Sequence, residues 1–322
     1  MKPCFTTPFI EKAAKAMGAR LLLEPDYRYT GQIIFKNGTR RYFKGATFDI
    51  NPAGAVKVVD DKDYSAIEGK VFFTPGWQDK IRSTQGVEAA CNYAQKLGFP
   101  VIVKPNDLSQ GAAVSKVHNL REFKAAIKAI PVRSRAFLVQ RVAEGNDYRM
   151  VVFDGQLICA YERRPLCVRG DGTSSIASLL VKKQRAFDKL GYITTIDAAD
   201  PRITEKLRRQ KLTLQSVPSR GETIYLLDNA NLSTGGNAHD VTDIIHPSYR
   251  KLAISITRDM GLRLCGVDIM TAGDIARPCK TYHVVELNAS PGLDHFSMLG
   301  KKQRDITAGL YRDILRALEK QA

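Results

Sequence analysis

The sequence predicts an α+β fold made of more than one subdomain. The chain has 322 residues, which exceeds the usual size of a single domain. Apolar residues make up 44% and charged residues 25%, as in a globular protein with a full core. Short β-rich runs are interspersed with amphipathic helices, and two Asx-Gly pairs mark hairpins, so sheets packed against helices are expected.

The first part, residues 1–58, is expected to be a small α/β piece. An amphipathic helix over residues 8–18 ends at a glycine, and short strands follow it. The run GQIIFKNGTRRYFKG is typical of a β-hairpin with its turn at Asn37-Gly38. Residues 1–58 therefore predict a helix followed by a small antiparallel sheet.

Residues 59–142 are expected to form a second unit. VEAACNYAQKLG (87–98) has helical spacing with a glycine stop, and FPVIVKP is a short β-rich run that ends at proline. NLREFKAAIKAI predicts a helix that opens at an Asn119 cap, and AFLVQRV (136–142) predicts another strand. This order of elements is typical of an α+β sandwich.

Residues 143–322 are expected to form a third unit. DYRMVVFDGQLICAYERRP reads as a hairpin that turns at Asp154-Gly155, and GTSSIASLLVKKQRAF as a capped helix. Helices are expected at 248–260 and about 301–320, with the strands LCGVDIMTA and YHVVELN between them. The polar segment 192–245 is interpreted as a long functional loop or an insertion.

Charge and cysteine content restrict the function classes. The 49 Lys and Arg residues exceed the 33 acids by 16, which suits a polyphosphate ligand, an acidic substrate, a nucleic acid or only a solvated basic face. The densest basic clusters, 206–211 and 301–304, are short, and no nucleic-acid fold signature is present, so no nucleic-acid partner is expected. The six cysteines form no C-x-x-C pair and no histidines have metal spacing, so reduced thiols are expected.

Hydropathy along the chain predicts a cytoplasmic protein without a membrane partner. No apolar run reaches the eighteen or so residues of a membrane span. The N-terminus meets Glu11 early and lacks the apolar block of a secretory signal.

Lys104 is a candidate phosphate ligand. It ends the apolar run PVIVKP and precedes NDLSQGAAV, a segment of small and polar residues. Small residues let backbone N–H groups approach and cradle phosphate, and a lysine adds a positive charge. The alternative is a lysine at a strand edge whose head reaches solvent.

Two apolar strands with acidic residues form the strongest candidate site. Glu286 and Asn288 lie two positions apart in VVELN and therefore share one face of the strand. If the strand GVDIM is its neighbour, Asp268 joins them in an all-oxygen site of the kind that Mg²⁺ prefers. The alternative is a pair of strand-end acids bound to arginines. In LVQRVAEGNDYR, Asp147 is a candidate for ribose hydroxyls or part of an ordinary polar connection.

Taken in chain order, these segments resemble the ATP-grasp superfamily. The resemblance is carried by KP, the small-residue loop, VQR with G-x-D-Y-R, GVD and VELNASPG. YERRPLCVRGDGTSSIASLL and NANLSTGGNAHDVTDIIHP are similar to the ATP-grasp portion of cyanophycin synthetases and to the ligase domain of bifunctional glutathione synthetases. The similarity covers roughly residues 59–300.

The resemblance implies roles for individual residues. Nucleotide contacts are implied for Lys62, Lys104, Ser109, Gln110, Gly111, Gln140, Arg141, Val142 and Asp147. Metal ligation is implied for Asp268, Glu286 and Asn288. A catalytic role near the transferred phosphate and acyl group is implied for Arg149, Arg163 and, through its backbone N–H, Gly292. The loop that lines the substrate site is implied to contain Asn231, Ser233, Thr234, Gly235 and Gly236.

The same resemblance implies an ADP-forming ligase. Its cofactors would be ATP and two Mg²⁺ ions, and its substrates amino acids or small peptides, acidic ones included; relatives often associate into homo-oligomers. A carboxylate would attack ATP to give an acylphosphate, which an amine then attacks. The alternatives are a ligase that modifies a peptide or protein acceptor, and a nucleotide-binding protein without turnover. One departure from relatives is SQGAAV, where Ala113 replaces a frequent second glycine.

Overall fold

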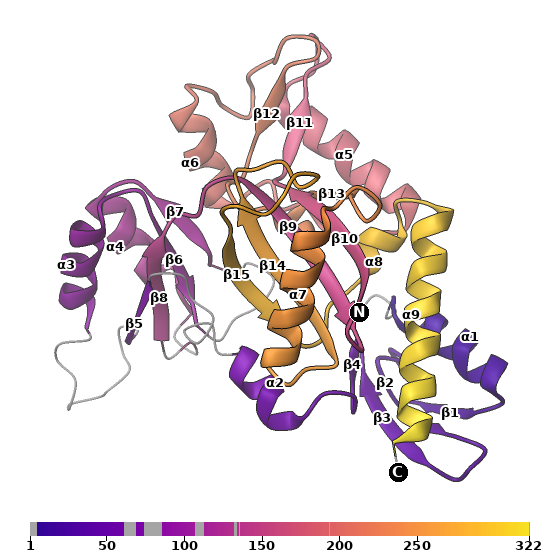
Figure 1. Cartoon of the computed structure of the whole chain (residues 1–322). Coiled ribbons are helices and arrows are strands. Elements are labelled where there is room, and N and C mark those ends of the chain that lie inside the picture. Colours follow the sequence, from indigo (N-terminus) through magenta and orange to yellow (C-terminus); the bar gives the residue numbers. More distant parts are fainter. Residues whose placement is uncertain are drawn as a thin grey trace.

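A computed structural model describes residues 5–60, 69–73, 86–106, 113–131, 134, 136–192 and 194–321, with only the backbone of 69–73. Three parts are visible in Figure 1. A small sheet with helices lies on one side of the molecule and a second small sheet on the other, and a five-stranded sheet stands between them. The architecture is α+β, as the sequence predicts.

The N-terminal part is a four-stranded antiparallel sheet with one helix against it. Helix α1 ends at Gly18, whose φ of 67° is the left-handed cap conformation that favours glycine. The pairing of β2 with β3 confirms the hairpin predicted at Asn37-Gly38. The elements are α1 (Thr7–Met17), β1 (Arg20–Leu23), β2 (Thr30–Ile34), β3 (Arg40–Lys44), β4 (Thr47–Phe48) and α2 (Ala53–Asp60).

The second part is an antiparallel sheet of order β5-β8-β6-β7, with two helices. The side chain of Asn119 accepts a hydrogen bond from the backbone N–H of Glu122 at 3.0 Å, so the predicted helix cap is confirmed. The elements are β5 (Gly69–Phe73), α3 (Val87–Leu97), β6 (Val101–Pro105), β7 (Ser115–Val117), α4 (Leu120–Lys128) and β8 (Ala136–Arg141).

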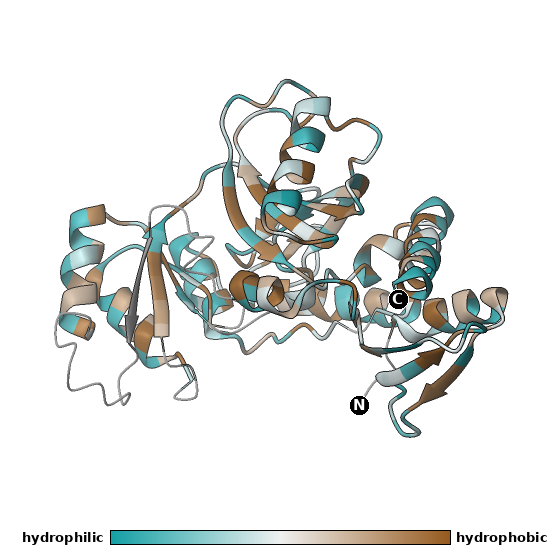
Figure 2. Ribbon diagram, turned by 60° about the horizontal axis from the view of Figure 1, so that its bottom comes forward, coloured by the Kyte–Doolittle hydropathy of each residue, from teal (hydrophilic) through white to brown (hydrophobic). Residues whose placement is uncertain are grey.

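The central five-stranded sheet has the order β13-β10-β9-β14-β15. One face packs on α7 through residues such as Val152, Ile269 and Tyr249, and the other packs on α9 through Val151 and Ile314. Figure 2 shows that the helices carry both hydrophobic and hydrophilic residues, as amphipathic helices on a core do. The elements are β9 (Asn146–Phe153), β10 (Gln156–Arg164), β13 (Asn237–Asp240), α7 (Pro247–Asp259), β14 (Leu264–Thr271), β15 (His283–Asn288), α8 (Asp294–Ser297) and α9 (Lys301–Lys320).

The polar segment 192–245 is not one long loop, and that part of the expectation is wrong. It contains α6, β12, the short 3₁₀ helix η2 and β13, and with β11 and α5 much of it forms a lobe above the central sheet (Figure 1). The lobe has its own small core, which includes Leu166, Ile176, Ile203 and Leu226. Its elements are β11 (Cys167–Arg169), α5 (Ile176–Leu190), α6 (Pro201–Arg209), β12 (Thr223–Tyr225) and η2 (Leu232–Thr234).

The N-terminal part and the C-terminal helix share one core. Ile10, Phe43 and Phe48 cluster with Tyr311 and Ile314 of α9. The amide of Asn51 accepts from the backbone N–H groups of Arg263 and Leu264 and donates to the carbonyls of Leu264 and Ala289. These contacts attach the N-terminal part, residues 5–51, to the sheet that carries the candidate site.

The five cysteines that the structure describes are free thiols, and Cys91, Cys159 and Cys265 are buried, as expected. No described helix combines the length and the apolar character that crossing a membrane requires.

Candidate active site

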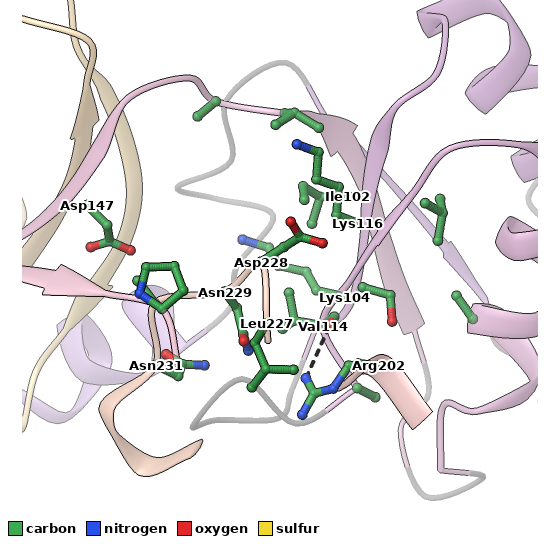
Figure 3. A pocket seen from close by; sticks show the side chains of 18 of the residues that line it. Ile102, Lys104, Val114, Lys116, Asp147, Arg202, Leu227, Asp228, Asn229 and Asn231 are labelled. Carbon is green, nitrogen blue, oxygen red and sulfur yellow. Dashed lines mark hydrogen bonds between the residues drawn. The ribbon is translucent and has the colours of Figure 1, made fainter. Parts of the chain in front are cut away.

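A cavity of about 1690 Å³ lies between the β5-β8-β6-β7 sheet, the central sheet and the lobe (Figure 3). This volume exceeds the roughly 300–1,000 Å³ of a pocket for one small ligand, so a nucleotide and a second substrate have room together. Residues predicted from the sequence line each of its walls. They are Lys104, Gln140, Val142, Asp147, Arg163, Asn231 and Glu286.

The first wall is formed by β6 and β8. Lys104 stands near the end of β6, is only 5% exposed and lines the cavity. Gln140 pairs with Ile102 across the two strands, and its side-chain oxygen is buried without a hydrogen-bond partner among the described residues. A buried acceptor without a partner costs about 1–3 kcal/mol, which a ligand N–H such as an adenine amino group would relieve.

A row of polar side chains crosses the central sheet. Tyr161 of β10 faces Arg149 of β9, Arg149 faces Asp268 of β14, and Asp268 faces Glu286 of β15. Directly opposite residues in antiparallel strands have their side chains on the same face. β14 and β15 are therefore neighbours, as the metal-site prediction requires. Of the four residues in the row, Glu286 lines the cavity, whereas Tyr161, Arg149 and Asp268 do not.

Arg149 and Asp268 of this row form a hydrogen-bonded network with the neighbouring pair Arg163 and Asp147. Nε and Nη2 of Arg149 each donate to one oxygen of Asp268 at 2.7 Å. Nη2 of Arg163 lies 2.9 Å from Asp268 and 2.6 Å from Asp147. Asn288 donates to Asp268 at 3.4 Å. The salt bridges that stood as the alternative to metal ligation are therefore present in the structure.

Burial and charge act in opposite directions on the two carboxyl groups. Burial would raise the pKa of Asp268, but Arg149 and Arg163 outweigh it and hold that pKa below its usual value. For Asp147, burial is the larger effect and raises the pKa to about 6, although Arg163 opposes this. We conclude that Asp268 is the firmly ionised member of the network.

The chemistry of the donors suits Mg²⁺. Asp268 and Glu286 supply carboxylate oxygens from paired strand positions, and Asn288 supplies an amide oxygen on the same face as Glu286. Mg²⁺ takes one or two protein carboxylates and completes its shell with water and substrate phosphates. No cluster of three or more His, Cys, Asp or Glu side chains arranged for a metal occurs among the described residues.

The predicted substrate loop closes against the end of β10. Gly235 has a φ of 100°, and a Cβ on Gly236 would lie 2.7 Å from the carbonyl oxygen of Arg164. The hydroxyl of Thr234 donates to the carbonyl of Asn231 at 3.0 Å. The two glycines thus allow the loop with Ser233 to approach β10, which carries Arg163.

Several predicted residues are not found in the cavity lining. Lys62, Ser109, Gln110 and Gly111 fall outside the described residues. Arg141, at the end of β8, and Gly292 are exposed and do not line the cavity. The other predicted residues that do not line it are Arg149, Ser233, Thr234, Gly235, Gly236, Asp268 and Asn288. Their roles stay predictions.

The structure adds residues that the sequence reasoning missed. Lys116, Glu144, Arg202 and Asn229 all line the cavity. For Arg202 a signal existed: Asp200-Pro201 combines a helix-capping residue with a proline at the first helical position. The others carry no local signal, because they reach the cavity only through the packing of the lobe.

Two residues after Gly292, His295 and Phe296, are buried and pack beside the site. Phe296 stacks on Tyr161 with ring centroids 5.4 Å apart, so it contacts the polar row and not the cavity. His295 is buried and lies 2.8 Å from the hydroxyl of Thr194, beside the ring of Tyr192. Neither residue lines the cavity.

Comparison with known proteins agrees with this geometry. A family model described as RimK-like ATP-grasp domain matches residues 228–312, and one described as D-ala D-ala ligase C-terminus matches residues 72–165. The crystal structure of a bifunctional glutathione synthetase from Pasteurella multocida superimposes with a TM-score of 0.59 at 21% identity, over 97% of this chain and 44% of that one. The chain has the ATP-grasp fold.

Sequence relatives narrow the resemblance. The chain is 37% identical over 205 residues to cyanophycin synthetase of Synechocystis sp., covering 61% of this chain and 23% of that protein. It is 30% identical over 234 residues to the glutathione biosynthesis bifunctional protein GshAB of Enterococcus faecalis, covering 69% of this chain and 30% of that protein. The resemblance drawn from the sequence motifs is confirmed, and the chain spans less than a third of these relatives.

Proposed function

We propose that this chain is an ATP-dependent carboxylate–amine ligase that joins amino acids or small peptides through an acylphosphate. The observation that carries the proposal is a cavity that residues of both sheets line. Lys104 and Gln140 reach it from one sheet, and Asp147, Arg163 and Glu286 from the other. The ATP-grasp fold and a relative named cyanophycin synthetase support the same activity.

The first step is phosphoryl transfer. An oxygen of the substrate carboxylate attacks the γ-phosphorus of ATP, the bond to the β-phosphate oxygen breaks, and ADP leaves. Lys104 supplies positive charge to the phosphates, and Arg149 and Arg163 donate to the transferred group. A guanidinium has five N–H donors, more than the two with which Arg149 binds Asp268. No nucleophilic side chain is required, because catalysis here is positioning and charge neutralisation.

The second step forms the amide. An amine attacks the acyl carbon, the carbon–oxygen bond to phosphate breaks, and the nitrogen loses a proton as phosphate departs. Mg²⁺ bound by Asp268, Glu286 and Asn288, with two ions proposed, would neutralise charge on the phosphates. The backbone N–H of Gly292 is proposed to face the oxyanion of the tetrahedral intermediate.

The cavity volume supports an amino acid or a short peptide bound beside ATP. A peptide or protein acceptor is the second candidate, because the same cavity has room for more than one free amino acid. Acidic substrates, a cytoplasmic location and a homo-oligomer remain part of the proposal.

Release of phosphate tests the activity. The protein would be mixed with Mg²⁺, ATP and pools of amino acids or short peptides, with products identified by mass spectrometry. We expect phosphate release with at least one pool and a product joined by loss of water. ATP binding without release in any pool would leave a nucleotide-binding protein without turnover.

A matched pair of variants ties the activity to the site. Glu286→Gln keeps size and hydrogen bonding but removes the charge, so turnover should fall by at least about a hundredfold, the scale of lost charge stabilisation at a reacting phosphate. Glu88→Gln, at an exposed position of α3, should keep full activity. Full activity in Glu286→Gln would refute the assignment of the metal ligands.

A further inference from the structure

A hydrogen bond joins two walls of the cavity. Nη1 of Arg202, in the first turn of α6, donates to the backbone carbonyl of Val114 at 3.2 Å (Figure 3). Arg202 belongs to the lobe, whereas Val114 directly precedes β7 of the β5-β8-β6-β7 sheet, which is called the small sheet below. Both residues line the cavity, so the bond joins the lobe to the β5-β8-β6-β7 sheet at the edge of the cavity.

The guanidinium of Arg202 is fixed in direction by its own helix cap. Asp200 caps α6 by accepting from the backbone N–H of Arg202 at 2.9 Å. The same carboxylate accepts from Nε at 3.0 Å and from Nη2 at 2.6 Å. Because Nε and Nη2 both bind Asp200, the planar guanidinium is fixed in orientation, and its third nitrogen, Nη1, points toward Val114.

The backbone that receives this bond is in an unusual conformation. Ala113, next to Val114, has a φ of 55°, in the left-handed region that residues with a Cβ rarely adopt. Such a conformation persists where surrounding contacts hold it. The hydrogen bond from Arg202 to the adjacent carbonyl is a contact of that kind.

Further charges face each other between the lobe and the small sheet. The hydrogen bond from Arg208 lowers the pKa of Glu205 on α6, and the charge of Arg121 at the start of α4 lowers it further. Burial lowers the pKa of His118, just before α4, and Arg209 of α6 lowers it as well. α6 therefore lies close to this end of the small sheet along several residues.

The held backbone lies beside the candidate phosphate ligand. Ser115 pairs with Val103 in β6, so Ala113 and Val114 continue β7 toward the end of β6, where Lys104 stands. We propose that Arg202 is a positioning residue, which holds the Ala113–Val114 backbone from the lobe and thereby sets the affinity for the phosphates of the nucleotide. This inference rests on the proposed function.

The test compares ATP with adenosine. Isothermal titration of Arg202→Gln with Mg-ATP should give a Kd at least about tenfold higher than that of the unmodified protein, since glutamine cannot hold both Asp200 and Val114. The Kd for adenosine should stay within about twofold of that of the unmodified protein, because the Ala113–Val114 backbone is proposed to affect only the binding of the phosphates. Arg208→Gln, on the same helix but ion-paired with Glu205, should bind ATP normally.

Ala113→Gly provides a rescue that a general loss of stability would not show. Glycine adopts the left-handed conformation without strain, so the backbone should depend less on Arg202. The effect of Arg202→Gln on ATP affinity should shrink at least threefold in the Ala113→Gly background. Thermal melting of each variant reports whether the fold is intact.

Two outcomes overturn the idea in different ways. If the unmodified protein binds ATP and Arg202→Gln binds it equally well, the positioning role is wrong and the proposed function stands. If the unmodified protein binds no ATP, the proposed function fails and this inference with it. An equal loss for ATP and adenosine, without rescue by Ala113→Gly, would show a merely structural role.

Discussion

Arg149 and Asp268 face each other on adjacent strands, and both oxygens of the buried carboxylate accept from the same guanidinium at 2.7 Å. Asp268 is 1% exposed and also binds Arg163, which in turn pairs with Asp147, so two arginines face two carboxylates. The network is a group of buried charges in which Asp147 and Arg163 line the cavity and Arg149 and Asp268 lie behind them. Removing its members should therefore have unequal effects.

Asp268→Ala should destabilise the fold more than Arg149→Met. Loss of the aspartate leaves two buried guanidinium groups without their shared partner, which costs about 3–5 kcal/mol. Arg149→Met leaves Asp268 with Arg163, so the free energy of unfolding should fall by less. Urea denaturation at pH 7.5 measures both.

The pair Arg263–Asp154 is the control for burial. It has the same two-pronged geometry, with distances of 2.7 and 2.8 Å, but its side chains are 35% and 40% exposed. Arg263→Gln should cost about 1 kcal/mol or less. A cost equal to that of Arg149→Met would show that burial is not what makes the inner pair important.

Lys104→Met should weaken binding of ATP but not of adenosine. Methionine keeps an unbranched apolar stem, and only the positive charge is lost. A Kd for ATP higher by about tenfold or more corresponds to at least ~1.4 kcal/mol of lost charge interaction. Lys128→Met, in the exposed last turn of α4, serves as the control. Equal weakening of both ligands would contradict a phosphate role.

Gly236→Ala should impair the amino-acid substrate selectively. The added methyl group would lie 2.7 Å from a backbone oxygen of Arg164, which cannot move aside as a flexible side chain could. The KM for the amino acid should rise about tenfold, ~1.4 kcal/mol, while the KM for ATP stays close to normal. Gly54→Ala, in helix α2 with open space around it, is the matched control. A change confined to ATP would contradict the assignment of this loop to the second substrate.

His295 should make stability depend on pH. Burial lowers the pKa of His295 in the folded protein, although Asp294 opposes this. In the unfolded chain the imidazole of His295 takes up a proton near pH 6.5, whereas in the folded chain it takes up a proton only at lower pH. The stabilising contribution is therefore complete above about pH 6.5 and is lost as the pH falls through the lowered folded value.

His295→Gln can still bind Thr194 but does not titrate. Urea denaturation of this variant between pH 5 and 7.5 should show a weaker loss of stability toward acid pH than the unmodified protein shows. His283→Gln, at an exposed position of β15, should retain the normal slope. Identical slopes in all three proteins would refute the role of His295.

Local patterns predicted many elements well because their causes are local. The Asn119 cap, the Gly18 stop and the turns at Asn37-Gly38 and Asp154-Gly155 involve residues close in sequence. Likewise, the two-residue spacing of Glu286 and Asn288 was sufficient to place them on one face. The domain boundaries at 58/59 and 142/143 stay predictions.

Long-range relationships could not be predicted in the same way. β11 and β12 are three residues long and lie more than fifty residues apart, so neither has a pattern that identifies its partner. The pairing of Arg149 with Asp268 depends on which strands are neighbours and on their register. Arg202 reaches Val114 only because the lobe folds over the cavity.

The shared core of α1, the N-terminal sheet and α9 has a consequence for synthesis on the ribosome. Ile10, Phe43 and Phe48 are made before Tyr311 and Ile314, on which they pack and from which more than 250 residues of chain separate them. At 5–20 residues per second, about 15–60 s separate α1 from α9. During that interval the early hydrophobic residues lack their native cover, so holdase chaperones should bind the nascent N-terminal part until translation of α9 is complete.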